Sequence, residues 1–207
     1  MQHLPKLLVE FIGTFFLCLA VALNTNAGTM NIIAIVGVLT AMIYAGGPIS
    51  AAHYNPAITL SFYLRGRISL RLGVYYVLAQ CLAAGGAALC AQQLLSTSFA
   101  PFPLLENWSA ALTAEVLGTF ALAFVIMAVA TSKHSKGNEY YGLAIGSAVA
   151  GLAYLLGPYS GAMFNPAVAL SQTSLGMYAW GELGFFWVVC PVGAAAATLV
   201  YNVVDPA

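Results

Sequence analysis

The sequence predicts an all-α membrane protein with six transmembrane helices, two re-entrant half-helices and an inverted internal repeat. The chain has 207 residues, of which 61% are hydrophobic and only 6% are charged, whereas a soluble domain carries about 25% charged residues. The charges leave long apolar gaps, each able to hold one or two spanning helices of about 20 residues. Two sequence motifs also occur twice, at matched places in the two halves of the chain.

The apolar segments between chain breakers predict the six spanning helices. We expect them at about 6–24, 30–48, 71–94, 109–132, 139–158 and 181–203. Barrel strands would be about 10 residues long and would alternate in polarity, and the chain shows no such alternation. The first segment stays apolar to Leu23 and carries Glu10, so we interpret it as mature sequence rather than as a signal peptide.

Two further apolar pieces, at 55–64 and 165–175, are too short to cross a bilayer. Ten helical residues extend about 15 Å, which is half of a hydrocarbon core of about 30 Å. Both pieces begin with Asn-Pro-Ala. Asparagine is a favoured N-cap, and proline fits the first helical position because no hydrogen-bond donor is lost there. The two pieces are therefore predicted to be half-helices that begin inside the membrane.

The second repeated motif is Glu-x-x-Gly-Thr-Phe, which starts at Glu10 and again at Glu115. Together with the Asn-Pro-Ala pair it divides the chain into halves of about 1–100 and 105–207. Each half holds three spans and one half-helix, and because three is odd, the second half must enter the membrane from the opposite face. Inverted repeats of this kind are typical of transport proteins, whose sites lie near the bilayer midplane.

The basic residues predict the orientation of the chain. With six spans and an N-terminus inside the cell, all six Lys and Arg residues fall on the cytoplasmic side, as the positive-inside rule requires. The outer loops are then expected near 25–29, 95–108 and 159–164, and both termini are expected to be cytoplasmic.

The half-helix starts predict a path for small uncharged solutes. Each helix start carries about half a positive charge, so two that face each other at the midplane oppose cations and leave neutral molecules unaffected. The loops at 48–54 and 159–164 must dip into the membrane, where irregular backbone is tolerated only if protein covers it or it lines a water-filled path. Their carbonyls and the two Asn amides can then form hydrogen bonds with a passing solute.

The stretches "SAAHYNPAITLS" and "SGAMFNPAVALS" resemble the two signature loops of the major intrinsic protein family, the aquaporins and aquaglyceroporins. The resemblance covers essentially the whole chain. It implies a single transmembrane channel domain over 1–207, a homotetramer in the cell membrane with one pore in each subunit, and passive flow of small neutral solutes, with or without water. It implies no enzyme activity, cofactor or metal. It assigns the pore motifs to Asn55, Pro56, Ala57, Asn165, Pro166 and Ala167, and the pore carbonyls and vestibule to Ala51, Ala52, His53, Tyr54, Gly161 and Met163.

The chain departs from the family at the position after the second tripeptide. Most similar members have an arginine there, at the narrowest part of the pore, and this chain has Val168. By similarity, the complete selectivity filter consists of Ile35, Ala153, Ala162 and Val168. A filter of small, uncharged side chains is expected to admit glycerol, urea or undissociated metalloid acids such as arsenous acid. An apolar ring can also impede water by dewetting if it is narrow, so the sequence leaves the rate of water flow open.

Two alternatives remain. One is a water-selective aquaporin, and the other is an ion- or proton-coupled secondary transporter, which would need titratable groups on the path. An acid within the membrane is a functional candidate by default, but the resemblance favours a structural role for Glu10 and Glu115, in which each carboxylate supports a re-entrant loop. The His and Cys residues show no metal-ligand spacing, and a net charge of zero does not suggest nucleic acid.

Small residues also predict where the spanning helices touch. The Gly142-x-x-x-Gly146 pattern indicates a close helix contact, and Ala41-x-x-x-Ala45 is expected to be its counterpart in the other half. Gln80 is interpreted as a packing residue.

Overall fold

The computed structural model describes residues 3–25, 31–95 and 99–206. The helices of these residues are α1 (Leu4–Thr25), α2 (Ile32–Ser50), α3 (Pro56–Leu64), α4 (Leu70–Leu94), a short 3₁₀ helix η1 (Leu104–Asn107), α5 (Trp108–Thr131), α6 (Tyr141–Ser160), α7 (Pro166–Ser174) and α8 (Trp180–Val204). Most of the outer loop expected near 25–29, and residues 96–98 of the one expected near 95–108, lie outside the described residues.

Six of these helices are long and apolar enough to cross a membrane, with mean hydropathies from 1.4 to 2.1. They are α1, α2, α4, α5, α6 and α8. The two short helices, α3 and α7, have nine residues each and begin at the prolines of the two Asn-Pro-Ala motifs. The predicted fold class, six spans with two half-helices, is therefore confirmed, and the chain is a multi-pass membrane protein.

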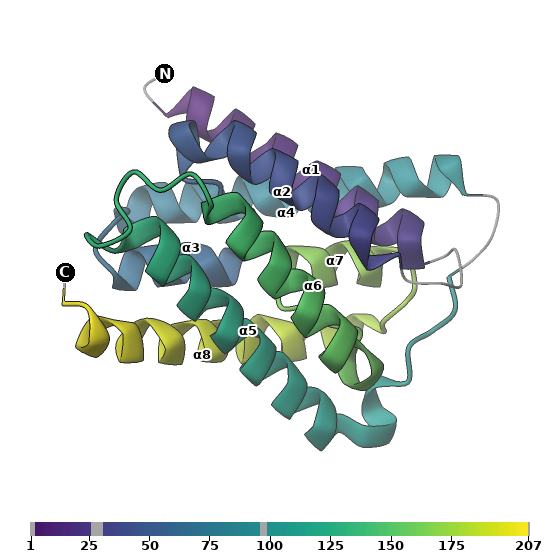
Figure 1. The fold of residues 1–207 in the computed structure, drawn as a ribbon. Coiled ribbons are helices and arrows are strands. Elements are labelled where there is room, and N and C mark those ends of the chain that lie inside the picture. Colours follow the sequence, from purple (N-terminus) through teal and green to yellow (C-terminus); the bar gives the residue numbers. More distant parts are fainter. Residues whose placement is uncertain (1–2, 26–30, 96–98, 207) are drawn as a thin grey trace.

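The helices form two groups, with the half-helices between them. Figure 1 shows α1, α2 and α4 in one group and α5, α6 and α8 in the other, while α3 and α7 come from opposite ends and meet near the middle. Within each group the closest packing is between α1 and α4 and between α5 and α8, and α2 packs on α6 across the groups. Both termini lie at the same end of the molecule (Figure 1).

Close packing between α2 and α6 depends on Gly142 and Gly146, the pattern that predicts a close helix contact. A Cβ added to Gly142 would collide with the ring of Tyr44, and one added to Gly146 would collide with the Thr40 hydroxyl. Ala41 and Ala45, the expected counterpart in the other half, are exposed in the single chain. The residues of α2 that meet the two glycines are Tyr44 and Thr40.

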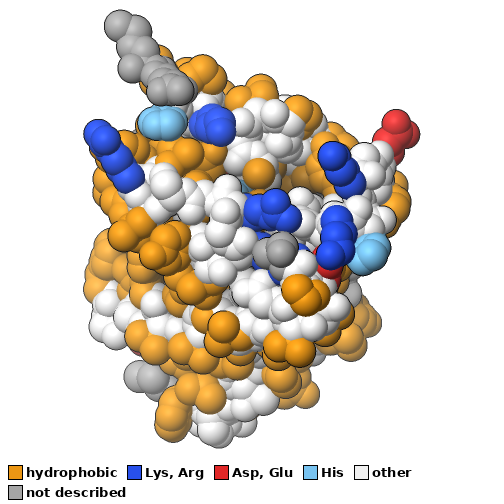
Figure 2. Space-filling model, turned by 90° about the vertical axis from the view of Figure 1, so that its left-hand side faces the viewer, with side chains coloured by type: hydrophobic (Ala, Val, Ile, Leu, Met, Phe, Trp, Pro, Cys, Tyr) orange, Lys and Arg blue, Asp and Glu red, His pale blue; other side chains and the backbone are white. Residues whose placement is uncertain are grey.

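The end of the molecule that carries both termini also carries the basic side chains. Figure 2 looks at this end and shows the blue Lys and Arg side chains gathered on it. One of them, Arg65, is buried and ties three helix ends together. It donates hydrogen bonds to Thr131 (3.2 Å), to Asn202 (2.8 Å) and to both the backbone oxygen and the carboxylate of Asp205 (2.6 and 3.3 Å). This cluster joins the end of α3 to the ends of α5 and α8.

Candidate functional site

The two asparagines of the repeated tripeptide begin the half-helices, as the sequence predicts. Asn55 and Asn165 have extended backbones, and each side-chain oxygen accepts a hydrogen bond from the backbone N–H two residues later, at 2.8 and 2.9 Å. Pro56 and Pro166 occupy the first helical positions. The carbonyl oxygen of each amide is therefore committed to its own helix, which leaves the NH₂ group for other partners.

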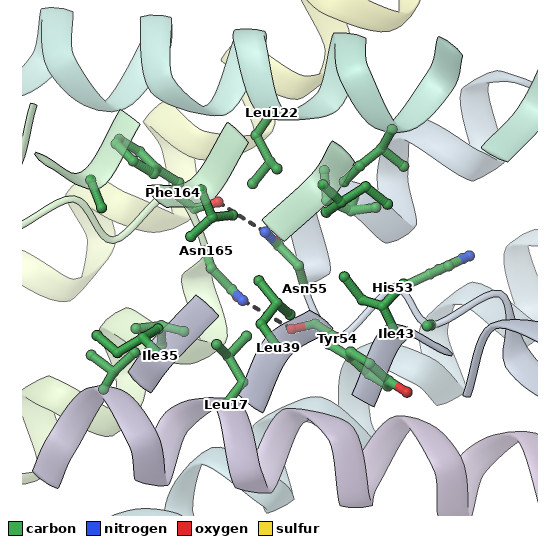
Figure 3. A pocket seen from close by; sticks show the side chains of 18 of the residues that line it. Leu17, Ile35, Leu39, Ile43, His53, Tyr54, Asn55, Leu122, Phe164 and Asn165 are labelled. Atoms are coloured by element: carbon green, nitrogen blue, oxygen red, sulfur yellow. Dashed lines mark hydrogen bonds between the residues drawn. The ribbon is translucent and has the colours of Figure 1, made fainter. Parts of the chain in front are cut away.

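Each asparagine also reaches across to the opposite half of the chain. The Nδ2 of Asn55 donates to the backbone oxygen of Phe164, and the Nδ2 of Asn165 donates to that of Tyr54, both at 2.9 Å. Figure 3 shows this reciprocal pair, with the two amides side by side. An NH₂ group has two hydrogens, so each amide keeps one donor after this bond. The crossed bonds hold the two half-helix starts together and aim the remaining donors at the cavity beside them.

The backbone that precedes each asparagine is irregular and partly strained. Ala51, Ala52 and Tyr54 in the first loop, and Ala162 and Phe164 in the second, have positive φ values between 48° and 70°. Residues other than glycine persist in this region only where their surroundings hold them there. Strong fixed contacts to these two loops are therefore required.

Glu10 and Glu115 supply those contacts. Both carboxylates are fully buried. Glu10 accepts hydrogen bonds from the backbone N–H groups of His53 and Tyr54, at 2.9 and 2.8 Å. Glu115 accepts from those of Met163 and Phe164, at 2.9 and 2.7 Å. Each carboxylate thus orders the loop that leads into one half-helix.

The serine that ends the preceding helix adds a further contact in each half. Ser50 and Ser160 each donate a hydrogen bond of 2.7 Å to the carboxylate of their own half. The backbone oxygens of the two serines accept hydrogen bonds from the hydroxyls of Tyr76 and Tyr178, at 3.0 and 2.8 Å. The serines were not predicted, although a signal existed, because each stands five residues before its asparagine.

The interpretation of Gln80 as a packing residue does not include its hydrogen bonds. Its amide nitrogen donates to Glu10 (2.9 Å) and to the hydroxyl of Thr59 (3.1 Å). In the second half, the fourth contact of the carboxylate is weaker, since Glu115 accepts only from the Cys190 thiol, at 3.5 Å. A glutamine in an otherwise apolar span was the available signal for a buried polar partner.

The glycine of the Glu-x-x-Gly motif makes room for the aromatic residue of the loop. Gly13 and Gly118 lie three residues after their glutamates, on the same helix face. A Cβ on Gly13 would overlap the ring of Tyr54, and one on Gly118 would overlap the ring of Phe164. The motif is therefore a loop-holding device, in which the carboxylate binds two backbone amides and the glycine accepts the ring.

We expect Gly118→Ala to destabilise the protein by about 1–3 kcal/mol, the range for overpacking a close-packed interior. Gly85→Ala is the matched control, because a Cβ at Gly85 meets no atom within 4 Å and alanine is the better helix former. Thermal unfolding in detergent checks the pair. Equal unfolding temperatures for the two variants would show that the ring of Phe164 does not need the glycine.

A narrow cavity runs beside the crossed asparagines. It has a volume of about 100 Å³ and is lined by both asparagines, by both loops and by apolar side chains of α1, α2, α5 and α6. Figure 3 shows Leu17, Ile35, Leu39 and Leu122 around the two amides. Polar groups therefore lie along one strip of a mostly apolar wall.

The four residues expected to form the selectivity filter, Ile35, Ala153, Ala162 and Val168, all line this cavity. All six residues expected to supply pore carbonyls or line the vestibule also line this cavity. Pro56, Ala57, Pro166 and Ala167 are instead buried in the helices behind it. Among the described lining residues, none is Lys, Arg, Asp or Glu. Besides apolar side chains, a molecule in the cavity meets two side-chain amides, backbone groups, one imidazole and two tyrosine side chains.

That imidazole belongs to His53, whose ring is held by neighbours. Its Nδ1 lies 3.1 Å from the Thr59 hydroxyl, which itself donates to the backbone oxygen of Asn55 (3.0 Å). Since that hydroxyl proton is in use, Nδ1 carries the hydrogen and Nε2 is the free acceptor. The ring also packs against those of Phe62 and Tyr76, with centroids 4.0 and 5.1 Å away.

A wider hollow of about 940 Å³ adjoins the cavity at the end of the molecule that carries the termini. Four residues, Ala51, His53, Ala130 and Tyr141, line both spaces. The hollow, which we call the basic vestibule, also receives the side chains of Lys6, Arg67, Lys133 and Lys136. The described residues therefore provide a wide mouth, a junction at His53 and a narrow apolar section.

Comparison with known proteins gives one consistent result. The family model of the major intrinsic proteins matches residues 1–201. The chain is 38% identical to the aquaporin NIP1-1 of Zea mays, over 97% of this chain and 75% of the relative, and 36% identical to nodulin-26 of Glycine max, over 97% and 78%. Its fold is similar to that of the aquaglyceroporin from Plasmodium falciparum, with a TM-score of 0.74, 20% identity and coverage of 97% and 96%.

Proposed function

The chain belongs to the major intrinsic protein family, whose members are channels and not enzymes, and we propose that it conducts small uncharged solutes through a widened apolar filter. The single observation that carries this proposal is the cavity wall, which includes Ile35, Ala153, Ala162 and Val168 and, among the described residues, no Lys, Arg, Asp or Glu. Glycerol, urea and undissociated metalloid acids such as arsenous acid are the proposed solutes. Water passes with them to the extent that the apolar section stays wet.

The physical argument is one of size and hydrogen bonding. Selectivity in a pore of this kind depends on its diameter, on the groups that line it and on electrostatic barriers. Two alanines and a valine occupy little volume, and none of the four filter side chains forms a hydrogen bond. A neutral solute with several hydroxyl or amide groups can use the backbone and the two asparagines on one side while its carbon skeleton faces the apolar wall.

A coupled secondary transporter is disfavoured by where the acids lie. Glu10 and Glu115 are the acids buried within the described spans, and each directs its hydrogen bonds at its own loop and neighbouring side chains. Among the described residues, neither lines the cavity or the vestibule. A proton-coupled cycle needs a titratable group that both the solute path and the solvent can reach, and these carboxylates are not placed for it.

We also propose that the chain forms homotetramers in the cell membrane, with both termini in the cytoplasm. The orientation is supported by the basic residues, which gather at the end that carries the termini (Figure 2), as the positive-inside rule requires of a cytoplasmic face. The tetramer is supported by family membership.

Isotonic swelling of proteoliposomes with a panel of solutes tests the proposed function. We expect glycerol, urea and arsenous acid to enter faster than into protein-free vesicles, with initial rates that a protonophore does not change. Rapid water flow with exclusion of all three solutes would contradict the widened filter and favour a water-selective aquaporin. Solute entry that a protonophore abolishes would favour the coupled transporter.

A further inference from the structure

The basic vestibule carries an unbalanced positive charge at one mouth of the path. Its lining includes Lys6, Arg67, Lys133 and Lys136, and among the described lining residues there is no Asp or Glu. Glu139 follows the lining residue Asn138 in the chain, but its side chain is exposed and does not line the vestibule. With His53 neutral, the mouth holds four positive charges and no negative one.

The two buried acids nearest this end, Asp205 and Glu10, are held by partners of their own. Arg65 is paired with Asp205, with 3.3 Å between Nη2 and Oδ2, and hydrogen bonding from Ser132, with the charge of Arg65, lowers the pKa of the Asp205 carboxyl and keeps it ionised. Glu10 lies behind the loop, where two backbone amides, Ser50 and Gln80 surround its carboxylate. Neither acid faces the vestibule among the described residues.

Among the described vestibule cations, Arg67 is the one whose side chain is held by a hydrogen bond to the backbone. Its guanidinium donates to the backbone oxygen of Thr131 (2.8 Å), and its own backbone N–H donates to that of Phe62 (2.8 Å). Phe62 packs on His53, with ring centroids 4.0 Å apart, and His53 lines both the vestibule and the narrow cavity. Arg67 is therefore anchored to the segment that packs on the junction, while its side chain stays exposed to solvent.

We propose that the basic vestibule, with Arg67 as its anchored member, determines charge selectivity in this channel, because the filter holds no charge to do so. This proposal rests on the function proposed above. The two half-helix starts contribute positive potential at the midplane, and the vestibule adds net charge at the cytoplasmic mouth. Low-dielectric walls concentrate such a field along a water-filled cleft, so cations are depleted before they reach the asparagines, while neutral solutes are unaffected.

Because the vestibule charges lie outside the membrane core, cation exclusion by this mechanism should depend on ionic strength. Exposed charges are screened over about 8 Å at physiological ionic strength and over about 30 Å at 0.01 M. Cation exclusion by the vestibule should therefore weaken as ionic strength rises. Exclusion by groups deep in a narrow apolar section would change much less, because few ions enter that section to screen them.

The first test uses the unmodified chain in proteoliposomes. Sodium permeability is measured with a tracer at constant sodium concentration, while a large impermeant organic salt sets the ionic strength, and glycerol entry is followed in the same vesicles. We expect sodium permeability to rise severalfold from 0.01 to 0.3 M salt, with glycerol entry unchanged. A sodium permeability that does not depend on ionic strength, in vesicles that conduct glycerol, overturns the vestibule proposal alone.

The second test removes the charges. A variant with Lys6, Arg67, Lys133 and Lys136 all replaced by Gln should raise sodium permeability by roughly tenfold at low salt, since one charge at about 10 Å in water changes local cation concentration roughly twofold. Two controls accompany it. Exchanging Lys and Arg at the same four positions keeps the charge, and Arg71→Gln removes a basic residue that does not line the vestibule.

The outcomes separate the two proposals. A rise in the glutamine variant, with none in the two controls and with normal glycerol entry, supports the vestibule. No rise in a variant that still conducts glycerol overturns it. Vesicles of the unmodified chain that conduct no solute contradict the proposed function and, with it, the vestibule proposal.

Discussion

Replacing Val168 with arginine is expected to lower glycerol and urea flux by roughly tenfold or more, which corresponds to an added barrier of at least about 1.4 kcal/mol. Val168 is 4% exposed and lines the narrow cavity two residues after the proline of the second half-helix. A longer, charged side chain there takes space from a cavity of only about 100 Å³. The guanidinium also adds hydrogen-bond donors to an apolar section, and these donors need water or solute molecules as acceptors.

Val168→Met is the matched control, because methionine adds length without charge. A loss of glycerol and urea flux in both variants would mean that the larger side chain blocks the path. A loss in the arginine variant alone would mean that the charge and its desolvation create the barrier. Isotonic swelling with the two solutes measures this, and water flux in the same vesicles shows that the pore still conducts. An unchanged solute range in the arginine variant would show that the side chain at 168 does not reach the path.

Replacing Glu10 with leucine is expected to prevent recovery of a stable, folded protein. The change leaves the backbone N–H groups of His53 and Tyr54 without their acceptor, together with Ser50 and Gln80. Each buried donor left unsatisfied costs about 1–3 kcal/mol, so the sum is comparable with a total folding stability of about 5–15 kcal/mol. The positive φ values of the first loop then lose their two carboxylate contacts, and the bonds of Ala52 to Ser50 and of Tyr54 to Asn165 and Met42 remain.

The second half offers a graded comparison. Glu115→Leu leaves two backbone amides and Ser160 unpaired, while its fourth contact is the weak Cys190 thiol at 3.5 Å. We therefore expect a severe but smaller loss than at Glu10. Glu182→Gln is the control, since this half-buried residue accepts its hydrogen bond from the backbone N–H of Ala179 at the start of α8 and holds no loop. Size-exclusion profiles and unfolding temperatures in detergent rank the three, and near-normal values for Glu10→Leu would show that the loop holds its shape without the carboxylate.

Much of the fold could be predicted because a spanning helix needs about 20 consecutive apolar residues, which are visible directly in the sequence. Long apolar runs indicate the spans, and Asn-Pro marks a helix start with little ambiguity, so α3 and α7 begin at the prolines as expected. Helix ends were less predictable. The span expected from 139 begins at Tyr141, because Glu139 and Tyr140 belong to the turn, where Tyr44 donates to the backbone oxygen of Glu139 (3.0 Å).

The contacts of the candidate site could be predicted only where the repeat pointed to them. Glu10 and Glu115 stand out as repeated acids, whereas Gln80 occurs once, and its partners lie 70 and 21 residues away. The pairing of Arg65 with Asp205 joins residues 140 apart, and no local pattern encodes it. The basic vestibule depends on the same kind of long-range assembly, since its four cations come from α1, the turn after α3 and the segment between α5 and α6.

Tracer exchange of labelled glycerol, at equal concentrations on both sides of proteoliposomes, tests the central claim most directly. It measures entry of the solute through the uncharged filter without requiring water to follow, so a poorly wetted pore cannot disguise the result. We predict exchange that is at least roughly tenfold faster than in protein-free vesicles, equivalent to a barrier lower by about 1.4 kcal/mol, and that is slowed in the Val168→Arg variant. Exchange no faster than in protein-free vesicles would contradict the account.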